Sequence, residues 1–227
     1  VAVICPGFSA ERRRRQPWHV ADGIARGLAA LGHEALVLTD TAGPPPAAPY
    51  RAQRVGRLIG RDGRASPALR EALTGFDRAF LVTGAAQLAR LRRLGLGVPV
   101  SLVMASPRLY VREILGRLGP AALWRERELL ALPLLNALLP GAALRAGFAR
   151  SGADEIVYLS PSARERFTRL GLPPGRLLLP QVEAAAIPPP LSPDRGPLTV
   201  GYFGPALALR GADLALRVFE EAVERGL

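Results

Sequence analysis

Short apolar runs alternate with longer segments of helical periodicity along most of the chain. Apolar runs closed by glycine, proline or polar residues are typical of strands that are buried on both faces of a parallel sheet. On this pattern the predicted strands are residues 1–5, 35–39, 79–83, 98–104, 156–159 and 177–179, with one edge strand inside the polar, arginine-rich stretch 51–64.

Between these runs, hydrophobic residues recur at helical spacing. In the first such segment Ile24, Leu28 and Leu31 form one apolar stripe, Pro17 suits the first helical turn and Gly32 suits the end. Further helices are predicted at 87–94, 108–118, 121–132, 161–170 and 212–225, with a short one beginning at residue 66 or 67. The leucine-rich stretch from residue 132 to residue 150 is less regular. Alternating strands and helices predict an α/β fold, a doubly wound parallel sheet with helices on both faces.

The composition changes between residues 184 and 197, which are rich first in alanine and then in proline. Such a segment is typical of an interdomain linker stiffened by polyproline geometry. We therefore expect one domain over 1–183 and the opening βα unit of a second doubly wound domain over 198–227, with its strand at 198–203. One strand and one helix bury too little surface to stand alone, so we expect this second domain to be incomplete.

The charge of the chain is strongly one-sided. All thirty cationic side chains are arginine, against nineteen acidic ones, and the formal net charge is +11. This excess favours anionic partners such as phosphates, acidic lipid or nucleic acid. Only 6% of residues are aromatic, and no predicted strand interleaves basic with aromatic residues. Nucleic acid therefore ranks low among the anionic partners.

The single cysteine, Cys5, excludes an internal disulfide framework and makes a reducing cytoplasm the default location. It lies inside a predicted strand, where it is most simply a core residue. The longest uncharged run, 129–144, is interrupted by prolines and shorter than the roughly 20 residues a spanning helix needs.

Four segments together resemble one family of enzymes. They are residues 3–7 with 18–21 and 29–34, residues 152–160, residues 171–180, and residues 200–204 with 210–211. Their order and spacing are similar to the nucleotide-sugar glycosyltransferases of the GT-B fold, specifically the retaining group 1 (family 4-like) set. The resemblance implies two facing Rossmann-like domains, an acceptor side in the first and a donor-binding side in the second.

Transfer from such a donor builds negative charge on the departing diphosphate, which needs preorganised positive charge and backbone N–H groups. Gly7, just past the first strand, has no Cβ and would let the backbone approach a phosphate; the alternative is a simple turn glycine. From the second domain, Gly204 and the pair Arg210 and Gly211 are similar to the family's phosphate-facing loop. Arg210 could equally be a solvated arginine at a helix start.

The acceptor-binding candidates are Phe8, Ser106 and Arg108, which follow predicted strands at the edge where such sites form, and His19, in the first turn of the first long helix beside the same cleft. His19 could instead pack against Trp18. His33 follows a helix end on the opposite side and is interpreted as structural.

No catalytic residue is assigned, because the glutamate pair that the resemblance implies would lie beyond Leu227. No spacing of His, Cys or Asp indicates a metal site, and no cofactor is expected besides the nucleotide-sugar substrate.

Two features favour contact with a membrane surface. Arg12, Arg13, Arg14 and Arg15 form a basic block in the first loop, and 108–150 is rich in leucine and arginine. A solvated loop beside core-covering helices is the alternative.

The sequence thus predicts a cytoplasmic glycosyltransferase whose acceptor is a carbohydrate or lipid-linked glycan. Peripheral contact with the inner face of the membrane is a further expectation. Residues 1–227 alone are expected to be inactive. A nucleotide-sugar epimerase of the same architecture, or a non-catalytic basic module that binds anionic lipid or nucleic acid, remains open.

Overall fold

The computed structural model describes residues 1–12, 17–41, 48–106, 109–118, 124–125, 127–179 and 212–225. The chain divides into two units, one formed by residues 1–108 and 139–181 and the other by residues 109–138 and 182–227. The first unit contains every strand that the structure describes, and the second contains helices in its described part.

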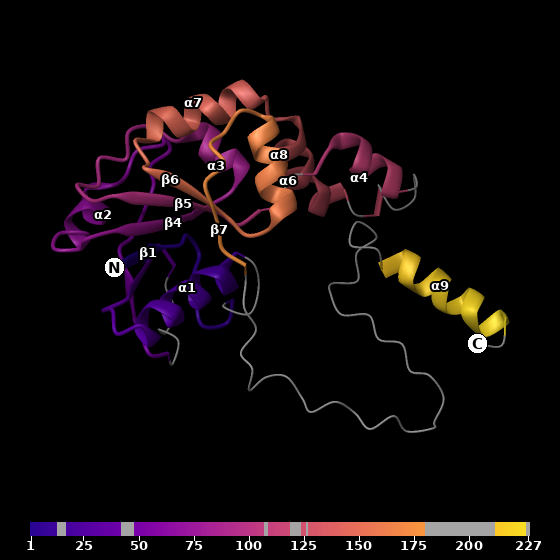
Figure 1. The fold of residues 1–227 in the computed structure, drawn as a ribbon, viewed down its shortest axis with the longest axis horizontal. Helices are drawn as coiled ribbons and strands as arrows, with labels where there is room; N and C mark the ends of the chain where they lie inside the picture. Colours follow the sequence, from indigo (N-terminus) through magenta and orange to yellow (C-terminus); the bar gives the residue numbers. More distant parts are fainter. Residues whose placement is uncertain are drawn as a thin grey trace. The chain divides into compact units, whose positions relative to one another are not determined.

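Seven parallel strands form one sheet in the first unit, in the order β3-β2-β1-β4-β5-β6-β7 (Figure 1). Their bounds are β1 Ala2–Ile4, β2 Leu36–Thr39, β3 Arg51–Arg54, β4 Ala79–Thr83, β5 Val100–Met104, β6 Glu155–Tyr158 and β7 Arg176–Leu177. Every strand of the sheet pairs in parallel with its neighbours, so the helices between strands must return the chain across a face. The predicted Rossmann-like α/β fold is confirmed.

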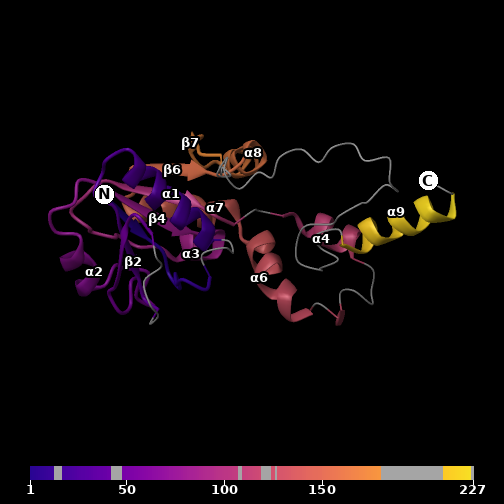
Figure 2. The same ribbon diagram turned by 90° about the horizontal axis from the view of Figure 1, so that it is seen from below.

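Helices cover both faces of this sheet (Figures 1 and 2). One face packs against α1 (Trp18–Ala30), and the other against α2 (Pro67–Ala72), α3 (Ala85–Arg90), α7 (Gly141–Ser151) and α8 (Pro161–Arg169). Because side chains alternate across a strand, Ile4 and Leu81 lie in the larger core with these four helices, while Val3 lies in the smaller core with α1. Burial on both faces explains why the central strands read as continuous apolar runs.

Helices α3 and α7 approach each other closely at Gly147. A Cβ built on this glycine would lie 2.1 Å from the backbone oxygen of Leu88. The two helices therefore approach to a distance that only glycine allows at this position.

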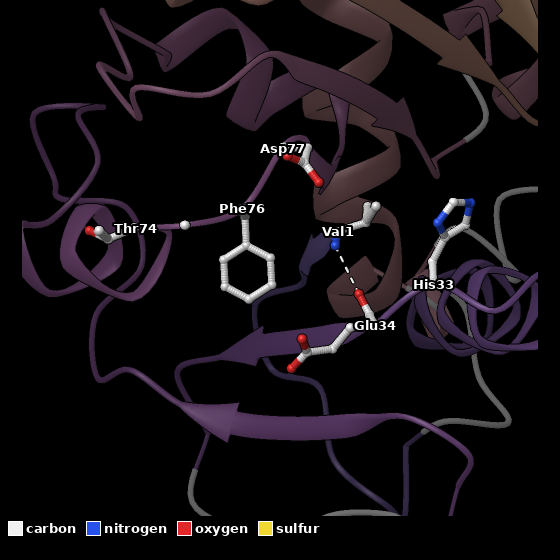
Figure 3. A pocket seen from close by; sticks show the side chains of 7 residues that line it. Val1, His33, Glu34, Thr74, Phe76 and Asp77 are labelled. Atoms are coloured by element: carbon white, nitrogen blue, oxygen red, sulfur yellow. Dashed lines mark hydrogen bonds between the residues drawn. The ribbon is translucent and has the colours of Figure 1, made fainter.

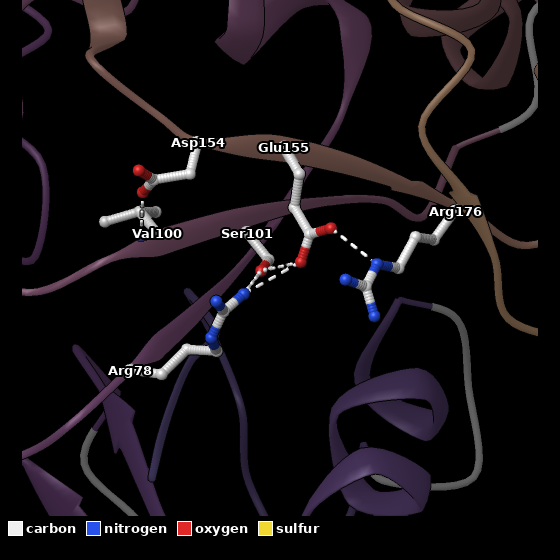
Figure 4. Close-up of polar contacts among 6 residues, drawn as sticks. All are labelled: Arg78, Val100, Ser101, Asp154, Glu155 and Arg176. Atoms are coloured by element: carbon white, nitrogen blue, oxygen red, sulfur yellow. Dashed lines mark hydrogen bonds and ion pairs between the residues drawn. The ribbon is translucent and has the colours of Figure 1, made fainter.

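A polar cluster joins the amino-terminal ends of four strands (Figure 4). Glu155 Oε1 accepts hydrogen bonds from the fully buried hydroxyl of Ser101 at 2.7 Å and from Arg78 at 2.8 Å. Its second oxygen pairs with Arg176 Nε at 2.8 Å. The carboxylate thus ties β5, β6 and β7 to the segment that enters β4.

The second unit contains α4 (Val111–Arg117), α6 (Arg127–Leu138) and α9 (Ala212–Glu224). Ile114, Leu118 and Leu130 form a small core in which α4 contacts α6. Several large apolar side chains in this unit are nevertheless exposed, namely Leu115, Trp124, Leu135, Leu138, Leu216, Val218, Phe219 and Val223. Within the described residues, no helix is both long and apolar enough to cross a membrane.

Two features differ from the sequence prediction. Leu31 is 77% exposed, because α1 ends at Ala30 and buries Val20, Ala21 and Ala25 instead, so the predicted stripe was wrong at its last member. The leucine-rich stretch that ends at residue 150, predicted to be less regular, contains α7. Packing against α3 stabilises this helix although it contains two glycines. The predicted linker 184–197 and strand 198–203 lie outside the described residues.

Candidate functional site at the carboxyl edge of the sheet

The strand order places a topological switch between β1 and β4. From β1 the chain builds outward to β2 and β3 on one side, and from β4 to β5, β6 and β7 on the other. In open parallel sheets ligands bind outside the carboxyl ends of the strands at such a switch. The loops that follow β1 and β4 therefore define the candidate site.

The loop after β1, residues 6–9 and hereafter the Gly7 loop, turns at Gly7 with φ of +70°. The N–H of Gly7 donates to Asp40 Oδ1 at 2.7 Å, and Thr39 Oγ1 donates to the Phe8 oxygen at 3.1 Å. Thr39 ends β2 and Asp40 follows it directly, so the neighbouring strand holds this loop in place.

Asp40 also affects the one thiol of the chain. The side chain of Cys5 is buried directly before the Gly7 loop. Burial, and to a smaller extent the negative charge of Asp40, raise the pKa of this thiol to about 12. The thiol is therefore neutral and unreactive, as expected for a core cysteine.

A tryptophan and an arginine cover the same loop. Trp18, at the start of α1, donates its indole N–H to the Pro6 oxygen at 2.9 Å. The guanidinium of Arg12 lies 5.3 Å from the centre of the Trp18 ring, a cation–π distance, and contacts the Gly7 oxygen at 3.5 Å. A Cβ on Gly7 would lie 3.2 Å from Trp18 Nε1, so this close packing favours glycine.

Ser106 lies beside the start of α3, on the other side of the switch. It follows β5, and its Oγ would lie 3.0 Å from a Cβ built on Gly84, the residue that precedes α3. The half-buried Ser106 is thus at the carboxyl edge of the sheet, after β5, which β4 separates from the strand of the Gly7 loop.

The predicted candidates that the structure describes differ in their exposure and partners. Phe8 is only 2% exposed and packs against Tyr50, which argues against contact of its side chain with an acceptor. His19 is exposed on the first turn of α1 and is not a partly buried ring. The Gly7 N–H, on which phosphate binding depended, already has a partner. Outside the described residues lie Arg13, Arg14, Arg15, Arg108, Gly204, Arg210 and Gly211.

Asp40, Thr39 and Trp18 were missed by sequence reasoning. The signal was present for Asp40, because a carboxylate that directly follows a buried strand must lie at the carboxyl edge. Its role as a partner of Gly7 depends on β1 and β2 being neighbours, which the pattern alone does not give. Within the described residues no group of three or more His, Cys, Asp or Glu side chains could hold a metal ion.

A hollow of about 350 Å³ lies at the opposite, amino-terminal edge of the sheet, and Figure 3 shows the side chains that line it. His33, Glu34, Thr74, Phe76 and Asp77 are among its lining residues. The position of His33 there agrees with its interpretation as a residue remote from the reaction edge. We do not assign the hollow to the functional site, since parallel sheets bind ligands at the other edge.

An all-parallel Rossmann-like sheet with a switch point defines the doubly wound class of α/β domains, in which ligands bind outside the carboxyl ends of the strands. Residues 17–180, from α1 through β7, match the family described as glycosyl transferase 4-like domain. The chain belongs to this family of glycosyltransferase domains. No curated protein and no solved structure matches the chain significantly.

Proposed function

We propose that this chain is part of an enzyme that transfers a sugar from a nucleotide-diphosphate donor to a carbohydrate or lipid-linked acceptor, with retention of anomeric configuration. The observation that carries the proposal is the family match, which spans the domain from α1 to β7. The family supports glycosyl transfer in general; the donor, the acceptor and the stereochemistry are our proposal.

The two-domain architecture that we expect assigns a separate role to each domain. Residues 1–183 would present the acceptor, residues 184–197 would act as linker, and residues 198–227 would begin the donor-binding domain. On the acceptor side, the Ser106 hydroxyl, the exposed imidazole of His19 and the side chain of Arg108 are candidates for hydrogen bonds to acceptor hydroxyls or phosphate.

The departing diphosphate needs cationic and N–H donors that are already in place when charge develops. We propose that Gly204, Arg210 and Gly211 supply them, because a guanidinium can bind a phosphate in bidentate fashion. Replacement of Arg210 by alanine in the natural protein should raise the donor KM or lower turnover by about tenfold or more. Unchanged kinetics would remove Arg210 from the site.

The direct test is sugar transfer by the natural protein that contains residues 1–227. A panel of nucleotide sugars is incubated with candidate acceptors, and the release of nucleoside diphosphate and the anomeric configuration of the product are measured by NMR. Transfer with retention supports the proposal. Isomerisation of the donor without transfer would favour the epimerase. The chain 1–227 alone serves as comparison.

We further propose peripheral contact with an anionic membrane surface. The exposed apolar side chains Leu115, Leu135 and Leu138 support it, as does the exposed Trp124, a residue type that favours the membrane interface. Each basic residue near such a surface contributes about 1 kcal/mol, so the Arg12 to Arg15 block would add to binding. Flotation with vesicles that contain or lack acidic lipid, at low and high salt, tests this. Absence of salt-sensitive binding would refute it.

A further inference from the structure

We propose that six exposed arginines around the ends of α3 and α7 form a docking surface for the acidic lipid headgroups of a membrane. This surface, the Arg90 patch, consists of Arg61, Arg64, Arg90, Arg92, Arg93 and Arg150. The inference deepens the membrane contact proposed above, which involves other residues, and it rests on that contact for the identity of the partner.

Three segments that are distant in sequence meet in the Arg90 patch. The Arg92 N–H donates to the Gly63 oxygen at 2.9 Å, and the Leu94 N–H donates to the Ser151 oxygen at 3.0 Å. A Cβ built on Gly63 would overlap the Arg90 oxygen, so these two segments are in direct contact. The end of α3 therefore holds the arginines of all three segments on one part of the surface.

The patch carries positive charge without a neutralising carboxylate. In the described part of the chain none of its six guanidinium groups pairs with an acidic side chain, and Arg90 and Arg150 donate to backbone oxygens at 3.3 and 3.2 Å. Asp62 is the one acidic residue in these three segments, and its Oδ1 accepts a hydrogen bond from a backbone N–H. Excess positive charge of this kind attracts an anionic partner.

Most of the positive excess of the first unit lies in this patch. The described residues of that unit carry eighteen arginines and ten acidic side chains. The patch segments hold six of these arginines and, with Asp62, one of the acids. The charged residues of the unit outside its described part are Arg13, Arg14, Arg15 and Arg108, which are all basic and cannot neutralise the patch.

The chemistry of the patch favours lipid headgroups over a protein or a single-stranded nucleic acid. A protein interface depends on apolar or aromatic anchors at its centre, and bound single strands stack their bases on aromatic rings. Residues 57–65, 89–95 and 149–152 contain no aromatic residue. Their large apolar side chains are packed in or against the core, namely Leu58, Ile59, Leu91 and Leu94. Guanidinium groups bind phosphate, and an anionic bilayer attracts basic residues without an apolar anchor.

The position of the patch leaves the candidate site accessible. Helices α3 and α7 end where the chain returns to the starts of β5 and β6, so the patch lies toward the amino-terminal edge of the sheet. The candidate site is at the carboxyl ends of the strands. Contact with a membrane through the Arg90 patch would therefore not cover that site.

Partition of the natural protein onto vesicles tests the proposal. The vesicles consist of phosphatidylcholine alone or of equal parts of phosphatidylcholine and phosphatidylglycerol, at physiological and at high salt. The double variant Arg92→Gln with Arg93→Gln should bind the acidic vesicles at least about fivefold more weakly than the wild type at physiological salt. High salt should reduce this difference, because it screens exposed charges. If the double variant does not fold, Arg64→Gln should still weaken binding by about threefold or more.

The matched control replaces Arg54 and Arg164 by glutamine. Both are exposed and the change in charge is the same, but they lie on β3 and α8, outside the patch. Binding should stay within about twofold of the wild type, because charges farther than about 8 Å from the lipid surface are screened. Equal losses in the two double variants, or a larger loss in the control, would overturn the patch while the membrane contact stands.

Two other results would overturn the assignment to lipid. If the wild type does not bind acidic vesicles, the membrane contact and the partner of the patch both fail, whereas the assay of sugar transfer is unaffected. If the wild type binds double-stranded DNA in place of acidic vesicles, and the loss of Arg92 and Arg93 weakens that binding, the partner is nucleic acid.

Discussion

The contact between α3 and α7 yields a stability prediction in which two known effects of one substitution oppose each other. Replacement of Gly147 by alanine favours the helix, since alanine in a helix interior is more stable than glycine by about 1 kcal/mol. The added Cβ, however, would lie 2.1 Å from the Leu88 oxygen and 2.8 Å from the Leu88 carbonyl carbon. Both are backbone atoms, so no rotamer change relieves the overlap.

The magnitude follows from the distance that must be recovered. A carbon and an oxygen atom need more than 3 Å, so α7 or α3 must shift by roughly 1 Å within a close-packed core. Such overpacking typically costs 1–3 kcal/mol, and a clash between two backbones belongs at the upper end of that range. After the gain in helix propensity, Gly147→Ala should destabilise the protein by about 2 kcal/mol, which is roughly 4–8 °C in Tm.

Gly27 in α1 is the matched control, since a Cβ there would meet no atom within 4 Å. Gly27→Ala should stabilise the protein by up to about 1 kcal/mol, because only the propensity effect remains. Both variants are compared with the wild type by urea denaturation and thermal melting. A Gly147→Ala variant as stable as Gly27→Ala would refute the close approach of the two helices.

Three further predictions concern polar groups. Glu155→Ala, which removes the acceptor of the buried Ser101 hydroxyl, should cost about 1–3 kcal/mol in urea denaturation, whereas Glu165→Ala in an exposed pair should cost under about 1 kcal/mol; equal costs would contradict this. Burial in the folded protein raises the pKa of the Cys5 thiol from 9.0 to about 12, so this thiol loses its proton at lower pH in the unfolded chain than in the folded one. The stability that the protonated thiol contributes is therefore complete below pH 9 and is lost as the pH rises from 9 to about 12. Cys5→Ala should flatten the fall in unfolding free energy over that range, and an unchanged slope would be the contrary result. Tyr158→Phe should cost about 1 kcal/mol in the same assay at pH 7, because it removes a 2.8 Å hydrogen bond to the Pro173 oxygen; full wild-type stability would count against that bond.

The fold class was predictable because the central strands are buried on both faces. Their apolar runs, such as the one that contains Leu81 and Val82, are interrupted by turns and helices at regular intervals, which is the pattern of a doubly wound sheet. Helix α7 was not predictable from propensity, since Gly141 and Gly147 weaken it. Its stability comes from contact with α3, which is distant in sequence.

The candidate site was only partly predictable for a related reason. The position of Gly7 after a strand identifies the loop, but the partner of its N–H is Asp40, which lies next to it only because β1 and β2 pair. Phe8 was a candidate because it follows the first predicted strand. In the structure the chain turns at Gly7 and directs Phe8 into the core beside Tyr50.

The buried thiol of Cys5 can serve as a probe of local opening of the protein. It is the single cysteine of the chain, and it lies immediately before the Gly7 loop, which hydrogen bonds with Asp40 and Trp18 hold in place. A thiol reagent can modify it only in molecules whose first loop has transiently come apart, so the labelling rate measures how often that happens. Molecules that occupy the carboxyl edge of the sheet could then be ranked by how much they slow that labelling, without any assay of turnover.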